Sequence, residues 1–261
     1  MRLWAVALMC AGLASADALY LDDSWPEATR ATLQELANEV WDVVAEMFHS
    51  SLPLDLPIRV RQSQAAVPMT RVLEDEINIR ITAHGTYYAQ FAFQLGHELG
   101  HVMLDPRRTN GVVEALCIAV SYEVLDRVGD KAAMSPAFPW LGDYAKNFQP
   151  YQRDDQNTVL KKFPREIQDL VAQKRWSELA DYLRAHAAEM EAGHANDREV
   201  QTLAAIALRS GPVEWGELAG IAGNTSPSVS EDPRFRVLPL TPEAIARASD
   251  LLCRMGIGGG N

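Results

Sequence analysis

Apolar residues recur with a helical period over residues 26–49. The apolar positions are close to 3.6 residues apart and share one helix face: Leu33, Leu36, Val40, Val43, Val44 and Met47. Pro26 suits the first turn of a helix, where no backbone N–H is needed. This pattern predicts a long amphipathic helix.

A different periodicity follows and predicts a small sheet. Residues 58–61 and 69–72 are expected as short strands. The clearest strand is 77–82, in which isoleucines alternate with polar residues. Strict alternation places one set of side chains on each face of a sheet. We therefore expect this strand to have one buried face.

Two helices are predicted on either side of a short loop. The first covers residues 87–104, with Thr86 as its N-cap. Residues 105–111 form the loop, which contains a proline and an Asn-Gly pair. The second helix covers 112–128 and is expected to stop at Gly129.

The remainder of the chain is predicted to be helical after an irregular stretch rich in proline and tryptophan. Helices are expected near residues 164–173, 175–191, 196–209 and 241–255, with a loop over 222–240. Strands and helices thus fall in separate runs, which is typical of an α+β fold. We divide the chain into a mixed part, residues 17–129, and an all-helical part, residues 130–261.

The N-terminus resembles a secretory signal peptide. Arg2 precedes an apolar run from Leu3 to Leu13, and Ala14-Ser15-Ala16 fits a cleavage site. We expect removal of residues 1–16 and export to the periplasm or the medium. A buried N-terminal helix and lipidation at Cys10 are the alternatives. Removal of the signal leaves Cys117 and Cys253, which pair or, equally well, leave Cys117 as a buried free thiol.

Composition and charge narrow the class of protein. The 48% apolar and 23% charged residues are typical of a soluble globular protein. After the N-terminal segment, the sequence contains no run of about 18 apolar residues, so no membrane span is predicted there. The net charge is −11, and no basic cluster exceeds a pair. This argues against nucleic acid or an anionic membrane as a partner.

The motif with the clearest chemistry is His97-Glu98-Leu99-Gly100-His101 in the predicted helix 87–104. Residues four apart share a helix face, so both imidazoles can reach one zinc ion. Glu98 points about 100° away from His97 and can act as general base toward a zinc-activated water. The alternative is a pair of hydrogen-bonded core histidines.

A catalytic zinc site needs a third protein ligand and an open position. An HExxHxxGxxH motif is excluded, because Leu104 and Arg107 stand at its last two defined positions. Glu114, thirteen residues after His101 in the next helix, is the better candidate if the two helices are antiparallel. An acid favoured by the helix N-terminus is the alternative interpretation. Other residues considered are His84, Asp105 and Glu123.

These residues resemble the gluzincin metallopeptidases, with HExxH on one helix, a glutamate on the next and an amphipathic strand before them. The resemblance covers residues 26–128, although the linker between His101 and Glu114 is short for a gluzincin. Gln90 to Gln94 and Leu116-Cys117 resemble a group of uncharacterised bacterial gluzincin-like proteins. The resemblance implies a zincin-like fold over 17–129 and attack of zinc-activated water on a peptide carbonyl.

Other residues are candidates for supporting roles. Gln90 and Gln94 share the helix face of His97 and are candidates for substrate binding, imidazole support or plain packing. The strand 77–82, similar to the zincin edge strand, is expected to bind an extended peptide if it lies at the edge. Tyr144 is our candidate for oxyanion stabilisation. The others are Tyr151, Tyr182, His186 and His194.

The sequence therefore predicts an exported zinc metallopeptidase acting on a peptide or protein substrate. His97, His101 and Glu114 would hold the metal, with Glu98 and Tyr144 as catalytic residues. The rival hypothesis is an exported, non-catalytic zinc-binding scaffold of the same fold. A closed four-ligand metal site would favour the scaffold, and an open one facing a groove the enzyme.

Overall fold

The computed structural model describes residues 19–49, 56–107, 109–134, 139–192, 197–218 and 242–257. The predicted signal peptide (1–16), the loop predicted over 222–240 and His194 lie outside these ranges. None of the described helices combines the length and apolarity needed to cross a bilayer.

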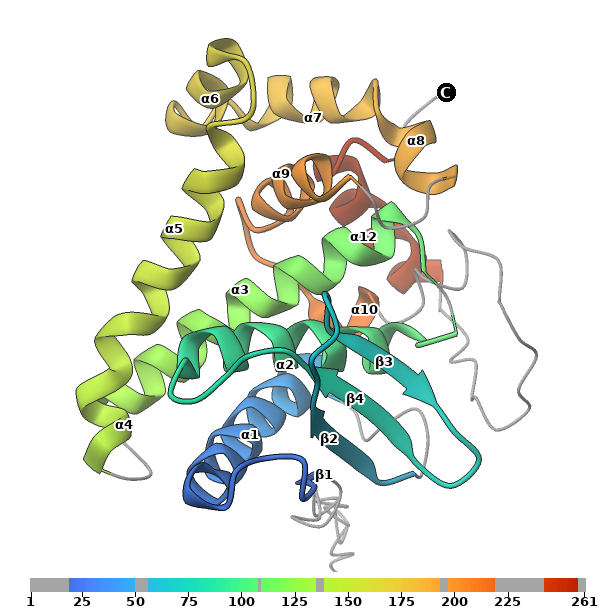
Figure 1. Ribbon diagram of the computed structural model, residues 1–261. Coiled ribbons are helices and arrows are strands. Elements are labelled where there is room, and N and C mark those ends of the chain that lie inside the picture. Colours follow the sequence, from blue (N-terminus) through green and yellow to red (C-terminus); the bar gives the residue numbers. More distant parts are fainter. Residues whose placement is uncertain are drawn as a thin grey trace, which may run out of the picture.

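The chain has an α+β fold with one small sheet and many helices (Figure 1). The sheet consists of β1 (Leu19–Leu21), β2 (Ile58–Gln62), β3 (Met69–Val72) and β4 (Ile77–Ile81). Its strand order is β1-β2-β4-β3, with β1, β2 and β4 parallel and β3 antiparallel to β4. The strand β1 was not predicted, because three residues are too few to show alternation.

The position of β4 corrects the prediction that 77–82 is a peptide-binding edge strand. β4 lies between β2 and β3, with Ile79 paired to Val60 on one side and to Thr70 on the other. Its polar face is buried as well, since Asn78 is only 3% exposed. The edge strand beside β4 is therefore β3.

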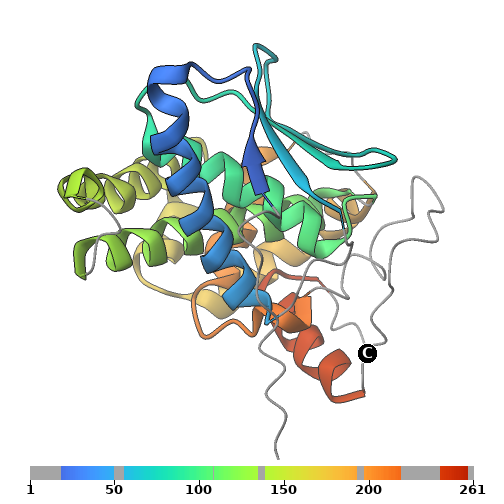
Figure 2. The ribbon, with the colours of Figure 1, turned by 90° about the horizontal axis from the view of Figure 1, so that it is seen from below.

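Three long helices pack with the sheet. They are α1 (Glu27–Phe48), α2 (Tyr88–Leu104) and α3 (Gly111–Met134). The first matches the predicted amphipathic helix, and its apolar face is buried against α2, α3 and β1. Figure 2 shows α1 running across the layer formed by α2 and α3. Two details differ: the N-cap of α2 is Tyr87, not Thr86, and α3 continues past Gly129. Gly129 is buried against Phe148, and this packing outweighs its low helix propensity.

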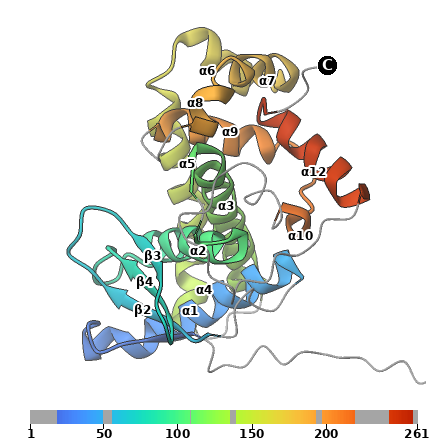
Figure 3. The same cartoon turned by 90° about the vertical axis from the view of Figure 1, so that its right-hand side faces the viewer.

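The remaining described segments form a helical part, shown away from the sheet in Figures 1 and 3. Its elements are α4 (Pro139–Tyr144), η1 (Ala145–Asn147), α5 (Phe148–Leu160), α6 (Arg165–Ala172), α7 (Trp176–Arg184), α8 (Ala187–Ala192), α9 (Arg198–Leu208), α10 (Trp215–Leu218) and α12 (Pro242–Arg254). The stretch predicted as irregular after Gly129 is thus helical over most of its described length. The predicted helix 175–191 is divided into α7 and α8.

Close contact between α2 and α3 positions the predicted metal ligands. Gly96 and Gly100 lie one turn apart on the face of α2 that meets α3. A Cβ at Gly96 would lie 3.2 Å from the Cβ of Val124, and one at Gly100 would lie 3.2 Å from Cys117 Sγ. The two helices therefore approach more closely than larger residues would permit.

Candidate metal centre

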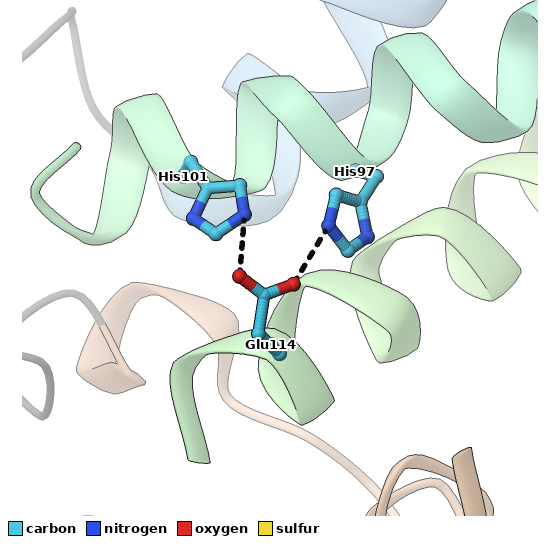
Figure 4. A group of neighbouring side chains, drawn as sticks. All are labelled: His97, His101 and Glu114. Atoms are coloured by element: carbon cyan, nitrogen blue, oxygen red, sulfur yellow. Dashed lines mark hydrogen bonds and ion pairs between the residues drawn. The ribbon is translucent and has the colours of Figure 1, made fainter. Parts of the chain in front are cut away.

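The structure brings His97, His101 and Glu114 together between α2 and α3 (Figure 4). The Nε2 atom of His97 lies 3.2 Å from Glu114 Oε2, and the Nε2 atom of His101 lies 3.4 Å from Glu114 Oε1. One oxygen of the carboxylate thus faces each imidazole. The three side chains are 12–17% exposed, so the group is mostly buried but still accessible to solvent.

The loop before α3 fixes the position of Glu114. Asn110 starts the helix, because its Oδ1 atom accepts a hydrogen bond from the Val113 N–H at 2.9 Å. The Thr109 hydroxyl donates to Glu114 Oε1 at 2.9 Å. Glu114 then lies in the first turn of α3, opposite the last two turns of α2. A turn this short suffices because the two helices are consecutive and directly packed.

The electrostatics of the group keep the Glu114 carboxylate ionised. Burial by itself would raise the pKa of Glu114, but hydrogen bonds with His101 and His97 outweigh burial and hold the pKa far below its ordinary value. For His101 burial lowers the pKa, while contacts with Cys117 and Glu114 raise it well above the ordinary value. The carboxylate thus stays ionised between the two imidazoles, as a metal ligand must.

The donor set and its spacing fit zinc. Two imidazole nitrogens and a carboxylate oxygen are common zinc ligands at about 2.0–2.2 Å, and tetrahedral ligand atoms at that radius lie about 3.3–3.5 Å apart. The N···O separations of 3.2 and 3.4 Å are close to that spacing, although each involves a different oxygen of Glu114. All three ligand atoms lie within 4.8 Å of one another. The group can therefore hold a metal ion.

Glu98 borders the same cavity as the three ligands but stands apart from them. It is 3% exposed, and the Thr70 hydroxyl, on β3, lies 2.7 Å from its Oε2 atom. The same hydroxyl lies 3.2 Å from the backbone carbonyl oxygen of Glu98. The carboxylate is thus oriented by the edge strand and left free of the ligand group.

A cavity of about 540 Å³ opens beside the ligands, a size typical of small-molecule and peptide sites. Its walls come from β3 and its preceding loop, from α2 and α3, and from the helical part of the chain through α5 and α9. The lining residues outside the HExxH motif and Glu114 include Met69, Thr70, Gln90, Phe93, Ile118, Tyr151, Arg198 and Gln201. The two predicted parts of the chain therefore meet at this cavity.

Several other candidates lie elsewhere. The structure does not bring Tyr144 to the ligand group: its hydroxyl accepts from the Ala89 N–H at 3.2 Å, at the opposite end of α2. Eight residues separate Ala89 from His97, about 12 Å along a helix. Tyr151 lines the cavity instead. Gln94 also lines it, but its amide is bonded to Thr82 and Ala83 and ties α2 to the end of β4.

The acidic and histidine alternatives for the third ligand have other partners. His84 Nδ1 lies 3.1 Å from Gln62 Nε2, and Asp105 pairs with Arg107. Glu123 pairs with Arg127 and Arg209. None of these acids or histidines belongs to the group that can hold a metal ion.

Tyr182 and His186, two other candidates for oxyanion stabilisation, do not line the cavity beside the ligand group. Their rings contact each other in a tilted arrangement. Cys117 and Cys253 are both free thiols, with Cys117 buried beside His101. The disulfide alternative is therefore wrong for this structure.

Three polar residues at the site were not predicted from the sequence. Thr109 lies five residues before Glu114, and a hydroxyl just before a helix is a signal that was available. Thr70 and Arg198 gave no such signal. Thr70 precedes Glu98 by 28 residues, and Arg198 begins a helix that is remote in sequence from the HExxH motif. Only tertiary packing brings these two residues to the cavity.

Comparisons of the chain with known proteins found no relative. No protein-family model, no curated protein and no solved structure matches the chain.

Proposed function

We propose that the chain is an exported zinc-dependent metallopeptidase with a zincin-like arrangement in residues 17–129. This proposal rests on one observation: on the wall of the cavity, the two carboxylate oxygens of Glu114 face the Nε2 atoms of His97 and His101, at 3.2 and 3.4 Å respectively. Export rests on the sequence of residues 1–16 alone.

Each residue has a distinct role in this proposal. His97, His101 and Glu114 hold the metal, which when bound would polarise a substrate carbonyl and make water more acidic. Glu98 accepts the proton of the attacking water and donates it to the departing amine. Thr70 holds the Glu98 carboxylate in the orientation needed for this transfer.

The edge strand β3 supports a peptide as substrate. β3 pairs with β4 on one side only, and Met69 and Thr70 line the cavity. An extended peptide can add to such an edge through main-chain hydrogen bonds. This arrangement would place a peptide carbonyl beside Glu98 and the ligand group.

The rival hypothesis, a metal-binding scaffold without turnover, requires a closed ligand sphere. The three-residue group and its cavity of about 540 Å³ favour the enzyme instead. A buried glutamate beside the ligands that does not itself join them also has little purpose in a structural site.

The test combines metal analysis of the mature protein with digestion of a peptide library. We expect about one zinc per chain, hydrolysis that chelation abolishes, and restoration by zinc. Glu98→Gln should retain zinc and lose turnover, whereas Glu35→Gln on the exposed face of α1 should behave as wild type. Undiminished hydrolysis by Glu98→Gln would refute the mechanism, and zinc binding with no hydrolysis of any peptide would favour the scaffold.

A further inference from the structure

Arg198 contributes a fixed positive charge to the cavity wall. It is the one lysine or arginine among the described residues that line this cavity. The chain as a whole is strongly acidic, with a net charge of −11. A permanently charged guanidinium at this place therefore stands out against the acidic character of the chain.

Asp155 orients the guanidinium of Arg198. The Nη2 atom of Arg198 donates to Asp155 Oδ1 at 2.6 Å, and the Tyr122 hydroxyl donates to Asp155 Oδ2 at 2.7 Å. The Arg198 side chain is 55% exposed, so the remaining N–H groups can reach a ligand. Asp155 thus fixes the arginine in place without enclosing it.

Arg198 also lies close to the proposed reaction centre. Its Cζ atom is 6.0 Å from the centre of the Phe93 ring, and Phe93 precedes His97 by one turn on the same face of α2. Residues one turn apart have Cβ atoms about 5–6 Å apart. These two steps sum to about 11–12 Å, and an extended peptide covers about 3.3–3.6 Å per residue, so up to about three residues would bridge the two places.

From this geometry we propose that Arg198 anchors a substrate carboxylate within about three residues of the scissile bond. A guanidinium binds a carboxylate through paired, charge-assisted hydrogen bonds, and Arg198 has the free N–H groups to do so. The proposal rests on the proposed metallopeptidase function and narrows its substrate class. The carboxylate can belong to a free C-terminus, which would make the enzyme a carboxypeptidase, or to an acidic side chain.

The test measures binding and so does not depend on turnover. Three acetylated tripeptides serve as probes: one with a free C-terminal carboxylate, its carboxamide, and a carboxamide ending in glutamate. Calorimetry on zinc-loaded Glu98→Gln should show at least about tenfold tighter binding of one or both acidic probes than of the neutral one. The preferred probe identifies the source of the carboxylate.

Substitutions then decide whether Arg198 causes the preference. Arg198→Gln in the same background should remove it, and Arg198→Lys should keep part of it. Arg165→Gln, an exposed arginine on α6, is the matched control and should keep all of it. A carboxylate can also bind zinc directly, so an acid preference that survives in Arg198→Gln overturns the proposal, as does the absence of any preference in the parent protein.

Turnover separates this proposal from the function on which it rests. In protein with an intact Glu98, Arg198→Gln should raise KM for the acidic peptide about tenfold or more, whereas the control Arg165→Gln should leave KM and kcat near wild type. If no peptide is hydrolysed but the binding preference depends on Arg198, the peptidase proposal fails and the carboxylate anchor stands. If peptides are hydrolysed with no such dependence, the anchor fails and the peptidase stands.

Discussion

The hydroxyl of Thr70 on the edge strand lies 2.7 Å from Oε2 of Glu98 on the metal-site helix. This hydrogen bond joins β3 to the residue proposed as general base, across 28 positions of sequence. Orientation of a carboxylate by a fixed donor preorganises it for proton transfer, since no rearrangement is then needed.

We expect Thr70→Val, which preserves the shape of the side chain, to lower kcat by about 10–100-fold, the range usual for supporting residues at metal sites. Zinc content and KM should change little, because a valine side chain would leave the ligands and the cavity wall in place. Thr70→Ser retains the hydroxyl and should keep most activity. Equal kcat values for wild type and Thr70→Val would show that this hydrogen bond is irrelevant to catalysis.

Zinc binding to His97, His101 and Glu114 should stabilise the folded protein. A metal that binds only the folded state stabilises it by about 4 kcal/mol when present at a thousand times its Kd. Thermal unfolding with and without a chelator should therefore show a clear rise in Tm with zinc for the wild type. His97→Ala should lose most of this rise, and His84→Ala, at an exposed histidine outside the ligand group, should keep it.

Gly111 begins α3 where α8 crosses it. A Cβ at this position would lie 2.9 Å from both the Cα and the carbonyl oxygen of Met190, which are backbone atoms that cannot move aside alone. Gly111→Ala should therefore lower the free energy of unfolding by about 1–3 kcal/mol, the usual cost of overpacking. It should also weaken zinc binding, because Glu114 lies in the displaced turn.

Gly129→Ala is the control for that variant within the same helix. Its new Cβ would lie 3.3 Å from the Cβ of Phe148, a less severe contact than the 2.9 Å at Gly111, and alanine favours the helix. Urea denaturation should show a much smaller loss of stability. A Gly111→Ala protein as stable as wild type would contradict the close packing of α8 on α3.

Burial raises the pKa of the Cys117 thiol from 9.0 to about 11. Below pH 9 the thiol is protonated in both the folded and the unfolded chain. Between pH 9 and 11 the unfolded chain ionises while the folded one keeps its proton, so stability falls as the pH rises. The loss from this thiol between pH 8 and 10.5 should be about 2 kcal/mol, from 1.36 kcal/mol per pKa unit.

The measurement is urea denaturation of the metal-free protein at both pH values, for wild type and Cys117→Ala. The variant lacks the thiol, so its free energy of unfolding should fall less between pH 8 and 10.5 than that of the wild type. The difference between the two losses should be about 2 kcal/mol. Parallel pH dependence in the two proteins would mean that Cys117 ionises as readily in the folded chain as in the unfolded one.

Local pattern was sufficient where the information is local. The helical period over 26–49 predicted α1 to within a residue at each end, and alternation predicted β2, β3 and β4. The spacing of His97 and His101 placed both imidazoles on one face of α2. Glu114 was predicted as their neighbour on the expectation that the loop reverses the chain and makes α2 and α3 antiparallel, and the structure places it beside both imidazoles.

Non-local pairing and burial decided what the pattern could not. The order of strands depends on contacts between distant segments, so only the structure shows that β4 is interior and β3 is the edge. Burial against Phe148 carries α3 through Gly129, although glycine on its own favours a stop.

The sequence by itself determined the α+β class, the α2 and α3 helices and the ligand residue types, because these follow from periodicity and from spacing within a few turns. Only the tertiary structure decided which distant side chains complete the site. Thr70 reaches Glu98, and Arg198 reaches the cavity, through the packing of β3 and α9 around the α2–α3 pair. Such contacts depend on how whole elements are placed, and no short stretch of sequence records that placement.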